Sequence, residues 1–232
     1  MNKKNFTYYG KSKSVPDTFQ AYLVKDAYFT HIEEYPILQK EMISSNIPKK
    51  IMPFSKAINY KGNLSNTFIC MYEPDKDFER IRKNPYRYIN FFKRTAGIIG
   101  FDFSIHSDMP LIKQKSQIND NLSLSYFYGS HGIPIIPNIR CGVDELHSEF
   151  YSAIPKNSLI AIGTHGFIKY KYEKYSWYCF LKDIIDNLSP SGIIVYGSLS
   201  GKLFDSFKEA TNFYYYTPWI YTHGKEGCKN VS

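Results

Sequence analysis

The sequence predicts an α/β fold in which mostly parallel strands alternate with helices, closer to an incomplete TIM-barrel-like fold than to an open doubly wound sheet. Short β-branched and aromatic runs bounded by turn residues recur in the second half of the chain, and segments of helical period separate them. Most of these runs are apolar throughout, as in parallel strands that are covered on both faces. The length of 232 residues fits a single core of this kind.

The individual elements follow from these patterns. Strands are expected at residues 67–72, 97–102, 133–138, 159–163, 192–197 and 213–217. Helices are expected at residues 85–94, 110–128, 175–188 and 202–210. Asn84 and Pro85 form a typical N-cap and first-turn pair, and Pro110 opens the next helix in the same way. The segment 175–188 carries apolar residues at helical spacing and stops before Pro190.

The chain divides into three parts by composition. Residues 1–60 contain short aromatic segments interrupted by prolines, so we expect an irregular basic arm that packs on the domain. Residues 61–220 form the α/β domain, and residues 221–232 are expected to be a flexible tail.

Composition excludes several classes of protein. No window approaches the roughly 20 apolar residues that cross a bilayer, and the start MNKKNFTYYG lacks the apolar stretch of a signal peptide. We therefore expect a cytoplasmic protein with no membrane partner. The cysteines form no C-x-x-C pair, so neither a zinc knuckle nor a disulfide framework is indicated. They are Cys70, Cys141, Cys179 and Cys228.

The formal charge of +8 lies entirely in the first part of the chain. Residues 1–96 hold 17 Lys and Arg against 9 Asp and Glu, whereas residues 97–232 hold 12 of each kind. Such asymmetry favours a partner that carries phosphates, although a basic surface can also serve solubility alone.

The densest basic stretch is RIRKNPYRYINFFKR, in which cationic and aromatic residues are interleaved. It predicts a surface that tracks a nucleic-acid backbone; the alternative is a solvated amphipathic helix with no such partner. The candidate nucleic-acid-binding residues are Arg80, Arg82, Lys83, Arg87 and Arg94.

Polar residues gather where the predicted strands end. In parallel α/β folds ligands bind at the carboxyl ends of the strands, so this face is the default site. Its members are Asp102, Asn138, Arg140, Thr164, His165, Tyr196 and Gly197. The alternative is that these are ordinary polar loop residues.

Two carboxylates and one imidazole lie within the segment DFSIHSD that follows a predicted strand. Asp102 and Asp108 could hold Mg²⁺ or Mn²⁺, or Asp102 could act as a general base. Asp108 could instead cap the helix that follows. Arg140 is suited to clamp a phosphate through two parallel hydrogen bonds, or to pair internally with Asp102.

Two further strand ends complete the candidate site. His165, between Thr164 and Gly166, is placed for proton transfer or for a structural hydrogen bond. The turn from Gly197 through Ser198 to Lys202 precedes a helix and could present backbone N–H groups to a phosphate. It is not a P-loop, because Leu203 stands where Ser or Thr is required, and a plain capped turn remains the alternative.

Five segments in order resemble an uncharacterised family of bacteria, phages and plasmids known as domain of unknown function 4417. They are TFICMYEPDKDFERIRKNPYRYIN, FDFSIHSDMP, HGIPIIPNIR, IAIGTHG and IIVYG, and the resemblance covers roughly residues 50–216. It implies a phage or mobile-element setting and no established activity. In the family a Trp commonly follows the P-N-x-R motif, where this chain has Cys141.

Two hypotheses of function follow. In the first, the protein acts on nucleic acid or on a nucleotide, with metal-assisted phosphoryl chemistry at the strand ends. In the second, it is a binding module without catalysis, either a replication accessory or a phage protein that captures a host nucleotide signal or a partner protein. The absence of G-x-S-x-G, H-E-x-x-H and G-x-G-x-x-G motifs keeps the second hypothesis open.

Overall fold

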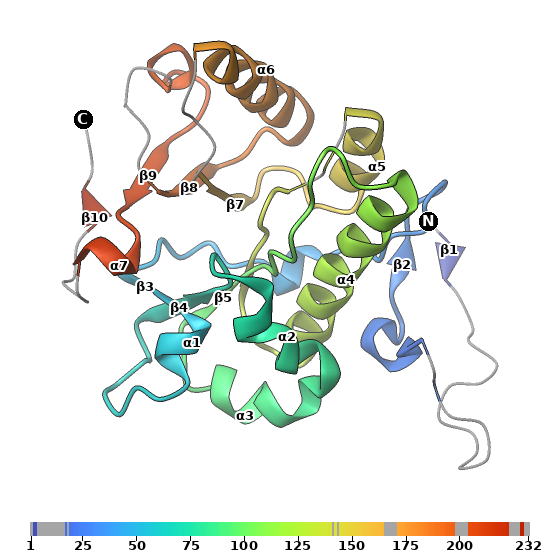
Figure 1. Ribbon diagram of the computed structural model, residues 1–232, viewed down its shortest axis with the longest axis vertical. Coiled ribbons are helices and arrows are strands. Elements are labelled where there is room, and N and C mark those ends of the chain that lie inside the picture. Colours follow the sequence, from blue (N-terminus) through green and yellow to red (C-terminus); the bar gives the residue numbers. More distant parts are fainter. Residues whose placement is uncertain are drawn as a thin grey trace.

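The computed structural model describes residues 2–3, 17, 19–140, 142, 144–164, 171–197, 204–222 and 228–229, with the backbone alone for 2–3, 171–174 and 228–229. It confirms the α/β class with mostly parallel strands and no closed barrel (Figure 1). The first sheet has the order β3 (Lys50–Pro53), β4 (Thr67–Cys70), β5 (Gly97–Ile99) and β6 (Ile135–Ile136), all parallel. The second contains β7 (Leu159–Gly163), β8 (Gly192–Tyr196) and β9 (Phe213–Tyr216) in parallel, with β10 (Cys228–Lys229) antiparallel at its edge.

The two sheets meet at the end of β6. Asn138 forms a parallel bridge with Ala161, and backbone hydrogen bonds join Ile139 N to Ala161 O and Ala161 N to Pro137 O, each at 2.8 Å. On the other side, the Tyr216 hydroxyl donates to the carbonyl of Pro48, next to β3. The backbone pairing of the first sheet therefore continues into the second between the end of β6 and β7.

Alternate residues of β3 to β9 pack together in one apolar cluster. It consists of Ile51, Phe68, Cys70, Ile99, Ile136, Leu159, Ala161, Ile194, Tyr196 and Tyr216. Because every one of these strands contributes to the same cluster, the two sheets curve around a shared interior. The other faces of the strands belong to the larger core beneath the helices. The expectation that the fold resembles an incomplete TIM barrel more than an open doubly wound sheet stays a prediction.

Seven α-helices occur in the described part of the chain (Figure 1). They are α1 (Phe54–Ala57), α2 (Asp75–Lys83), α3 (Ile89–Phe92), α4 (Leu111–Ser130), α5 (His147–Ser152), α6 (Lys171–Leu188) and α7 (Trp219–Thr222). Short 3₁₀ turns are η1 (Ala21–Val24), η2 (Lys40–Met42), η3 (Pro85–Tyr88), η4 (Asp144–Leu146) and η6 (Asp205–Phe207). The strands β1 (Asn2–Lys3) and β2 (Tyr28–Phe29) pair antiparallel.

Three local expectations differ from the structure. The helix expected at residues 85–94 is divided into η3 and α3, and Asn84 makes no side-chain cap there. In the described part of the segment 202–210 only η6 is helical. The helix α2 was not expected, because Phe78 and Ile81 are its only buried residues among charged neighbours.

The expected arm contains a strand of the first sheet. Residues 50–53 form β3, which pairs with β4, although Pro48 precedes this strand and Pro53 is its last residue. Proline is tolerated here because β3 is the edge strand of its sheet. The arm also covers α4: a Cβ at Gly129 would lie 2.9 Å from Cβ of Met42, so the two segments are in close contact. In the described part of the chain, no helix combines the length and the apolarity needed to cross a bilayer.

Candidate functional site

A cavity of about 1210 Å³ opens where the parallel strands end. One side is formed by the loops after β5 and β6 and by the last residue of β7, and the other by η4, α5 and α6. The residues that line it include Asp108, Asn138, Arg140, Asp144, His147, Tyr151, Gly163, Tyr175, Trp177, Asp183 and Asn187. A hollow at this face matches the place where parallel α/β folds bind their ligands.

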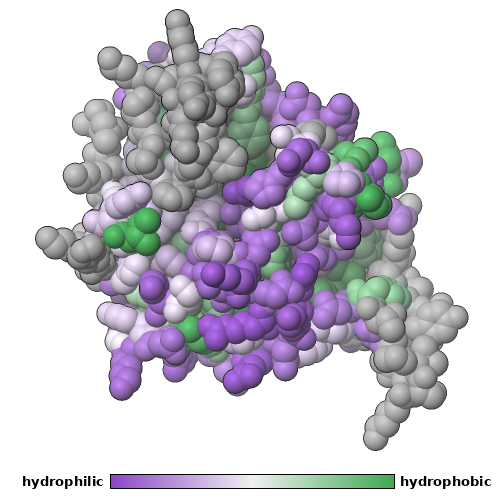
Figure 2. Space-filling model, in the orientation of Figure 1, coloured by the Kyte–Doolittle hydropathy of each residue, from purple (hydrophilic) through white to green (hydrophobic). Residues whose placement is uncertain are grey.

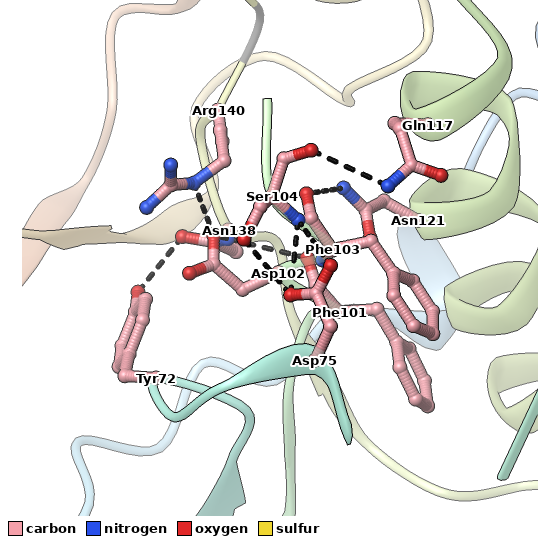
Figure 3. A network of polar contacts seen from close by, with 10 residues as sticks. All are labelled: Tyr72, Asp75, Phe101, Asp102, Phe103, Ser104, Gln117, Asn121, Asn138 and Arg140. Atoms are coloured by element: carbon pink, nitrogen blue, oxygen red, sulfur yellow. Dashed lines mark hydrogen bonds and ion pairs between the residues drawn. The ribbon is translucent and has the colours of Figure 1, made fainter. Parts of the chain in front are cut away.

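A buried polar network supports the strand-end side of the cavity (Figure 3). Asp102 is only 7% exposed, and its Oδ1 accepts hydrogen bonds from Asn138 Nδ2 at 2.7 Å and from Arg140 Nε at 2.5 Å. The Tyr72 hydroxyl donates to Asn138 Oδ1 at 2.8 Å. Each side chain in this chain of contacts therefore fixes the orientation of the next, ending at the Arg140 guanidinium on the cavity wall.

The backbone around the network has little spare room. A Cβ at Gly163 would lie 2.7 Å from the Tyr72 ring, so only glycine lets this ring pass the end of β7. Tyr72 also stacks on Tyr196, with ring centroids 5.1 Å apart. A Cβ at Gly100 would lie 2.9 Å from the backbone N of Asn138. These close approaches set the positions of Tyr72 and Asn138.

Burial controls the electrostatics of this network. Burial raises the pKa of Asp102, and the Arg140 guanidinium and the Asn138 amide lower it without cancelling that effect. Burial also raises the pKa of the Tyr72 hydroxyl, which thus donates as a neutral phenol. Because the folded-state pKa of Asp102 lies above its unfolded value, its contribution to stability is lost as pH rises through the folded-state pKa. An ionised Asp102 is therefore held at a cost to the fold.

A second set of contacts clamps the loop after β5 (Figure 3). The Asp75 carboxylate accepts from the Ser104 hydroxyl at 2.9 Å and from the Ser104 backbone N–H. Asn121 on α4 accepts from the Phe103 backbone N–H at 2.8 Å and donates to the Phe103 carbonyl. Helices α2 and α4 thereby fix the loop that carries Asp102.

The opposite wall of the cavity contains a histidine that the sequence analysis missed. His147 Nδ1 lies 2.8 Å from Asp183 Oδ2, and the Tyr151 hydroxyl donates to the same oxygen at 2.9 Å. Asn187 Nδ2 donates to Asp183 Oδ1 at 2.9 Å. The pair comes from α5 and α6, 36 residues apart, and no sequence motif joins the two.

The remaining strand-end candidates have internal partners or lie outside the description. Thr164 is buried, and its backbone N–H donates to the Tyr196 carbonyl at 3.0 Å. The Tyr196 hydroxyl accepts a hydrogen bond from the Trp219 backbone N–H. The backbone of Gly197 has a φ of 146°, in the region that favours glycine. His165, Ser198 and Lys202 lie outside the described residues.

The structure gives the expected Mg²⁺ or Mn²⁺ site no support. Asp102 is buried and its Oδ1 already accepts from Asn138 and Arg140, whereas Asp108 is exposed at the cavity. Among the described residues, no group of three or more His, Cys, Asp or Glu side chains could hold a metal ion. A carboxylate paired with a guanidinium is a poor fit to a hard cation.

The basic stretch lies away from the cavity. Helices α2 and α3 are on the side of the molecule away from α5 and α6 (Figure 1), under a largely hydrophilic surface (Figure 2). Arg82 forms ion pairs with Glu79 at 2.8 Å and Asp120 at 2.7 Å, and its guanidinium lies over the Phe103 ring. The other candidates, Arg80, Lys83, Arg87 and Arg94, are exposed, and the Arg80 guanidinium lies over the Phe54 ring.

The fold and the site define an α/β protein whose parallel strands end at a polar cavity with an ion-paired wall. The chain belongs to the family described as Domain of unknown function (DUF4417), which matches residues 29–215. This confirms the resemblance found in the sequence. The match runs from β2 into β9 and so includes most of the described part of the expected arm.

The curated relatives are phage proteins. The chain is 25% identical over 125 residues to the Gene 1 protein of Mycobacterium phage L5, covering 54% of this chain and 55% of the relative. It is 22% identical over 125 residues to the Gene 1 protein of Mycobacterium phage D29, covering 54% of this chain and 46% of the relative. The chain thus matches about half the length of each. No solved structure matches it.

Proposed function

We propose that this protein binds the phosphate of a nucleotide in the strand-end cavity and acts in the cytoplasm of a phage-infected cell. The observation that carries the proposal is Arg140, held through Nε by the buried Asp102 at the cavity wall. Because Asp102 holds the guanidinium of Arg140 at Nε, the group is oriented before a ligand arrives, which lowers the entropic cost of binding an anion. A buried ion pair adds little net stability, so orientation of the guanidinium explains the Asp102–Arg140 pair better than stabilisation of the fold does.

The cavity also offers surfaces for a base. Tyr175 and Trp177 line it on the α6 side, and Tyr175 is 73% exposed. Aromatic faces stack on nucleobases, and a cavity of about 1210 Å³ has room for a nucleotide-sized molecule. Arg140 and the aromatic residues lie on different walls, as the two ends of a nucleotide require.

The test measures nucleotide affinity in three variants. We expect mass spectrometry of the purified protein to identify a bound nucleotide, which is then used in isothermal titration. Arg140→Ala should weaken its binding about 10- to 100-fold, because a charged hydrogen-bonding partner is lost. Arg140→Lys should restore only part of this loss, since lysine keeps the charge but not the two-pronged geometry. Arg94→Ala is the matched control, an exposed arginine just before β5, and should leave the affinity unchanged.

The proposal fails if no nucleotide copurifies and none of the common ribo- and deoxyribonucleotides binds, or if Arg94→Ala weakens binding as much as Arg140→Ala. Thermal unfolding of each variant, recorded in parallel, separates a lost contact from a lost fold. A variant that loses affinity but keeps its melting temperature has lost a contact in the site and not the fold.

Nucleic acid is the second candidate, favoured by the concentration of positive charge in residues 1–96. If α2 and α3 track a phosphate backbone, the log of the oligonucleotide affinity must fall with log salt by roughly 0.7 to 0.9 per phosphate neutralised. Replacing Arg87 and Arg94 together should then reduce the slope by about two. A failure of oligonucleotides to bind at low salt rejects this candidate and leaves the nucleotide proposal standing.

A further inference from the structure

The α5–α6 wall of the cavity has the geometry of an acid–base pair. Asp183 receives hydrogen bonds on both oxygens, from Tyr151 on Oδ2 and from Asn187 on Oδ1. With these donors in place, the carboxylate can accept a further hydrogen from His147 Nδ1 at 2.8 Å. This network assigns the hydrogen to Nδ1, so Nε2 carries the lone pair.

The surroundings of His147 fix its ring. Its side chain is only 11% exposed, and the ring packs against Tyr151 and Phe180. Within the described residues, the charged groups that face it are Asp183 from α6 and Asp144 from η4, whose Oδ1 lies 3.8 Å from Nε2. Asp144 is fully exposed, so its interaction with the ring is weakened by solvent. An oriented imidazole on a cavity wall, backed by a carboxylate, is the usual arrangement of a general base.

We propose that His147 and Asp183 form a general-base pair that makes the protein a hydrolase of nucleotide phosphates. The inference rests on the proposed function, because Arg140 on the strand-end wall must hold the phosphate. His147 Nε2 takes a proton from a water molecule, and the water oxygen forms a bond to phosphorus. The bond from phosphorus to the leaving oxygen breaks, and that oxygen receives the proton back from the imidazolium. Asp183 holds the ring and stabilises its charged form during the step.

The residue that holds the phosphate and the residue that activates the water line the same cavity. Arg140 and Asn138 stand on the strand-end side, whereas His147, Tyr151 and Asp183 stand on the helix side. A guanidinium that neutralises the phosphate makes it a better target for attack, and the facing base supplies the nucleophile. The competing explanation is structural, in which the pair only joins α5 to α6.

The experiment follows release of inorganic phosphate and nucleoside products from ribo- and deoxyribonucleotides with the full-length chain. His147→Gln should lower turnover by about 10²-fold or more while nucleotide affinity by titration is unchanged. Asp183→Asn should lower it similarly, because the amide can present hydrogens to Nδ1 and reverse the tautomer. Asp186→Asn is the matched control on the same helix, where Asp186 contacts the exposed Lys182, and should turn over as the parent does.

The pH profile separates catalysis from a structural role. An imidazole base works only when neutral, so turnover should rise with pH along one ionisation, and this limb should disappear in the residual activity of His147→Gln. A structural role predicts instead a lower melting temperature with unchanged turnover per folded molecule. Nucleotide binding without turnover, or turnover unaffected by His147→Gln, overturns the inference and leaves the proposed function intact. If the protein binds no nucleotide, the inference and the proposed function are both rejected.

Discussion

Adding one methyl group at the end of β7 should disturb both the fold and the candidate site. In Gly163→Ala the new Cβ would lie 2.7 Å from Cε1 and 2.8 Å from Cδ1 of Tyr72. Ordinary carbon contacts begin near 3.4 Å, so the ring must retreat by about 0.7 Å. That movement lengthens the 2.8 Å hydrogen bond from Tyr72 to Asn138 and disturbs the stack on Tyr196.

Opposing effects set the size of the change. Overpacking of a filled site costs about 1–3 kcal/mol, and the weakened hydrogen bond adds about 1 kcal/mol. Replacing glycine by alanine returns about 0.4–1 kcal/mol, because the unfolded chain has less freedom. The net loss in the free energy of unfolding should therefore be about 1–3.6 kcal/mol. For a chain of this length that lowers the melting temperature by roughly 2–4 °C per kcal/mol.

The same substitution should weaken nucleotide binding. Asn138 orients Asp102, which in turn holds Arg140, so loss of the Tyr72 contact should lower the affinity by about 3- to 10-fold. Thermal denaturation and isothermal titration measure the two effects. Gly132→Ala is the control: its φ of 77° disfavours alanine, but beyond its chain neighbours no atom of the described residues lies within 4 Å of the new Cβ. It should lose stability without losing affinity. An unchanged melting temperature and affinity in Gly163→Ala would show that the Tyr72 ring does not set the position of Asn138.

Two further predictions concern the helical layer and the arm. Arg82→Ala should lower the free energy of unfolding by about 1–2 kcal/mol in urea titrations, because two partly screened ion pairs and the contact with Phe103 are lost, while nucleotide affinity stays the same. Loss of oligonucleotide binding at unchanged stability would contradict that structural role. In Glu149, burial raises the side-chain pKa, but hydrogen bonds from Thr30, Glu33 and Ile32 outweigh it and lower the pKa overall. Its stabilisation is therefore present above the unfolded-state pKa of about 4.5 and is lost as pH falls through the lower folded-state pKa. Melting temperatures of the parent and of Glu149→Gln should differ at neutral pH and converge in acid, and a constant difference would show that Glu149 does not titrate in this way.

The strands that the sequence predicted are those marked by an apolar run of their own. The apolar runs at 67–72, 97–102, 159–163 and 192–197 all contain strands, because buried parallel strands need continuous apolar residues. The strand β3 escaped notice, because Pro48 before it and Pro53 at its last position indicate a break unless the strand is known to lie at an edge.

The candidate site was predicted only in part, for a similar reason. The pairing of Arg140 with Asp102 was one of two readings of the strand ends, and the structure contains it. The pair of His147 and Asp183 depends on the packing of α5 against α6, which no local pattern reveals. The same holds for Arg82, whose partner Asp120 lies 38 residues away on α4. Sequence spacing finds residues at strand ends but not contacts made by packing of distant helices.

The central claim is that the strand-end cavity holds a nucleotide phosphate against Arg140. A crystal structure of the protein with the nucleotide that copurifies with it tests this most directly. If Arg140 binds the phosphate, density for a phosphate lies within hydrogen-bonding distance of its guanidinium, with the base against the α6 wall. Density for the nucleotide on the α2–α3 surface, with none in the cavity, would show that Arg140 does not hold the phosphate.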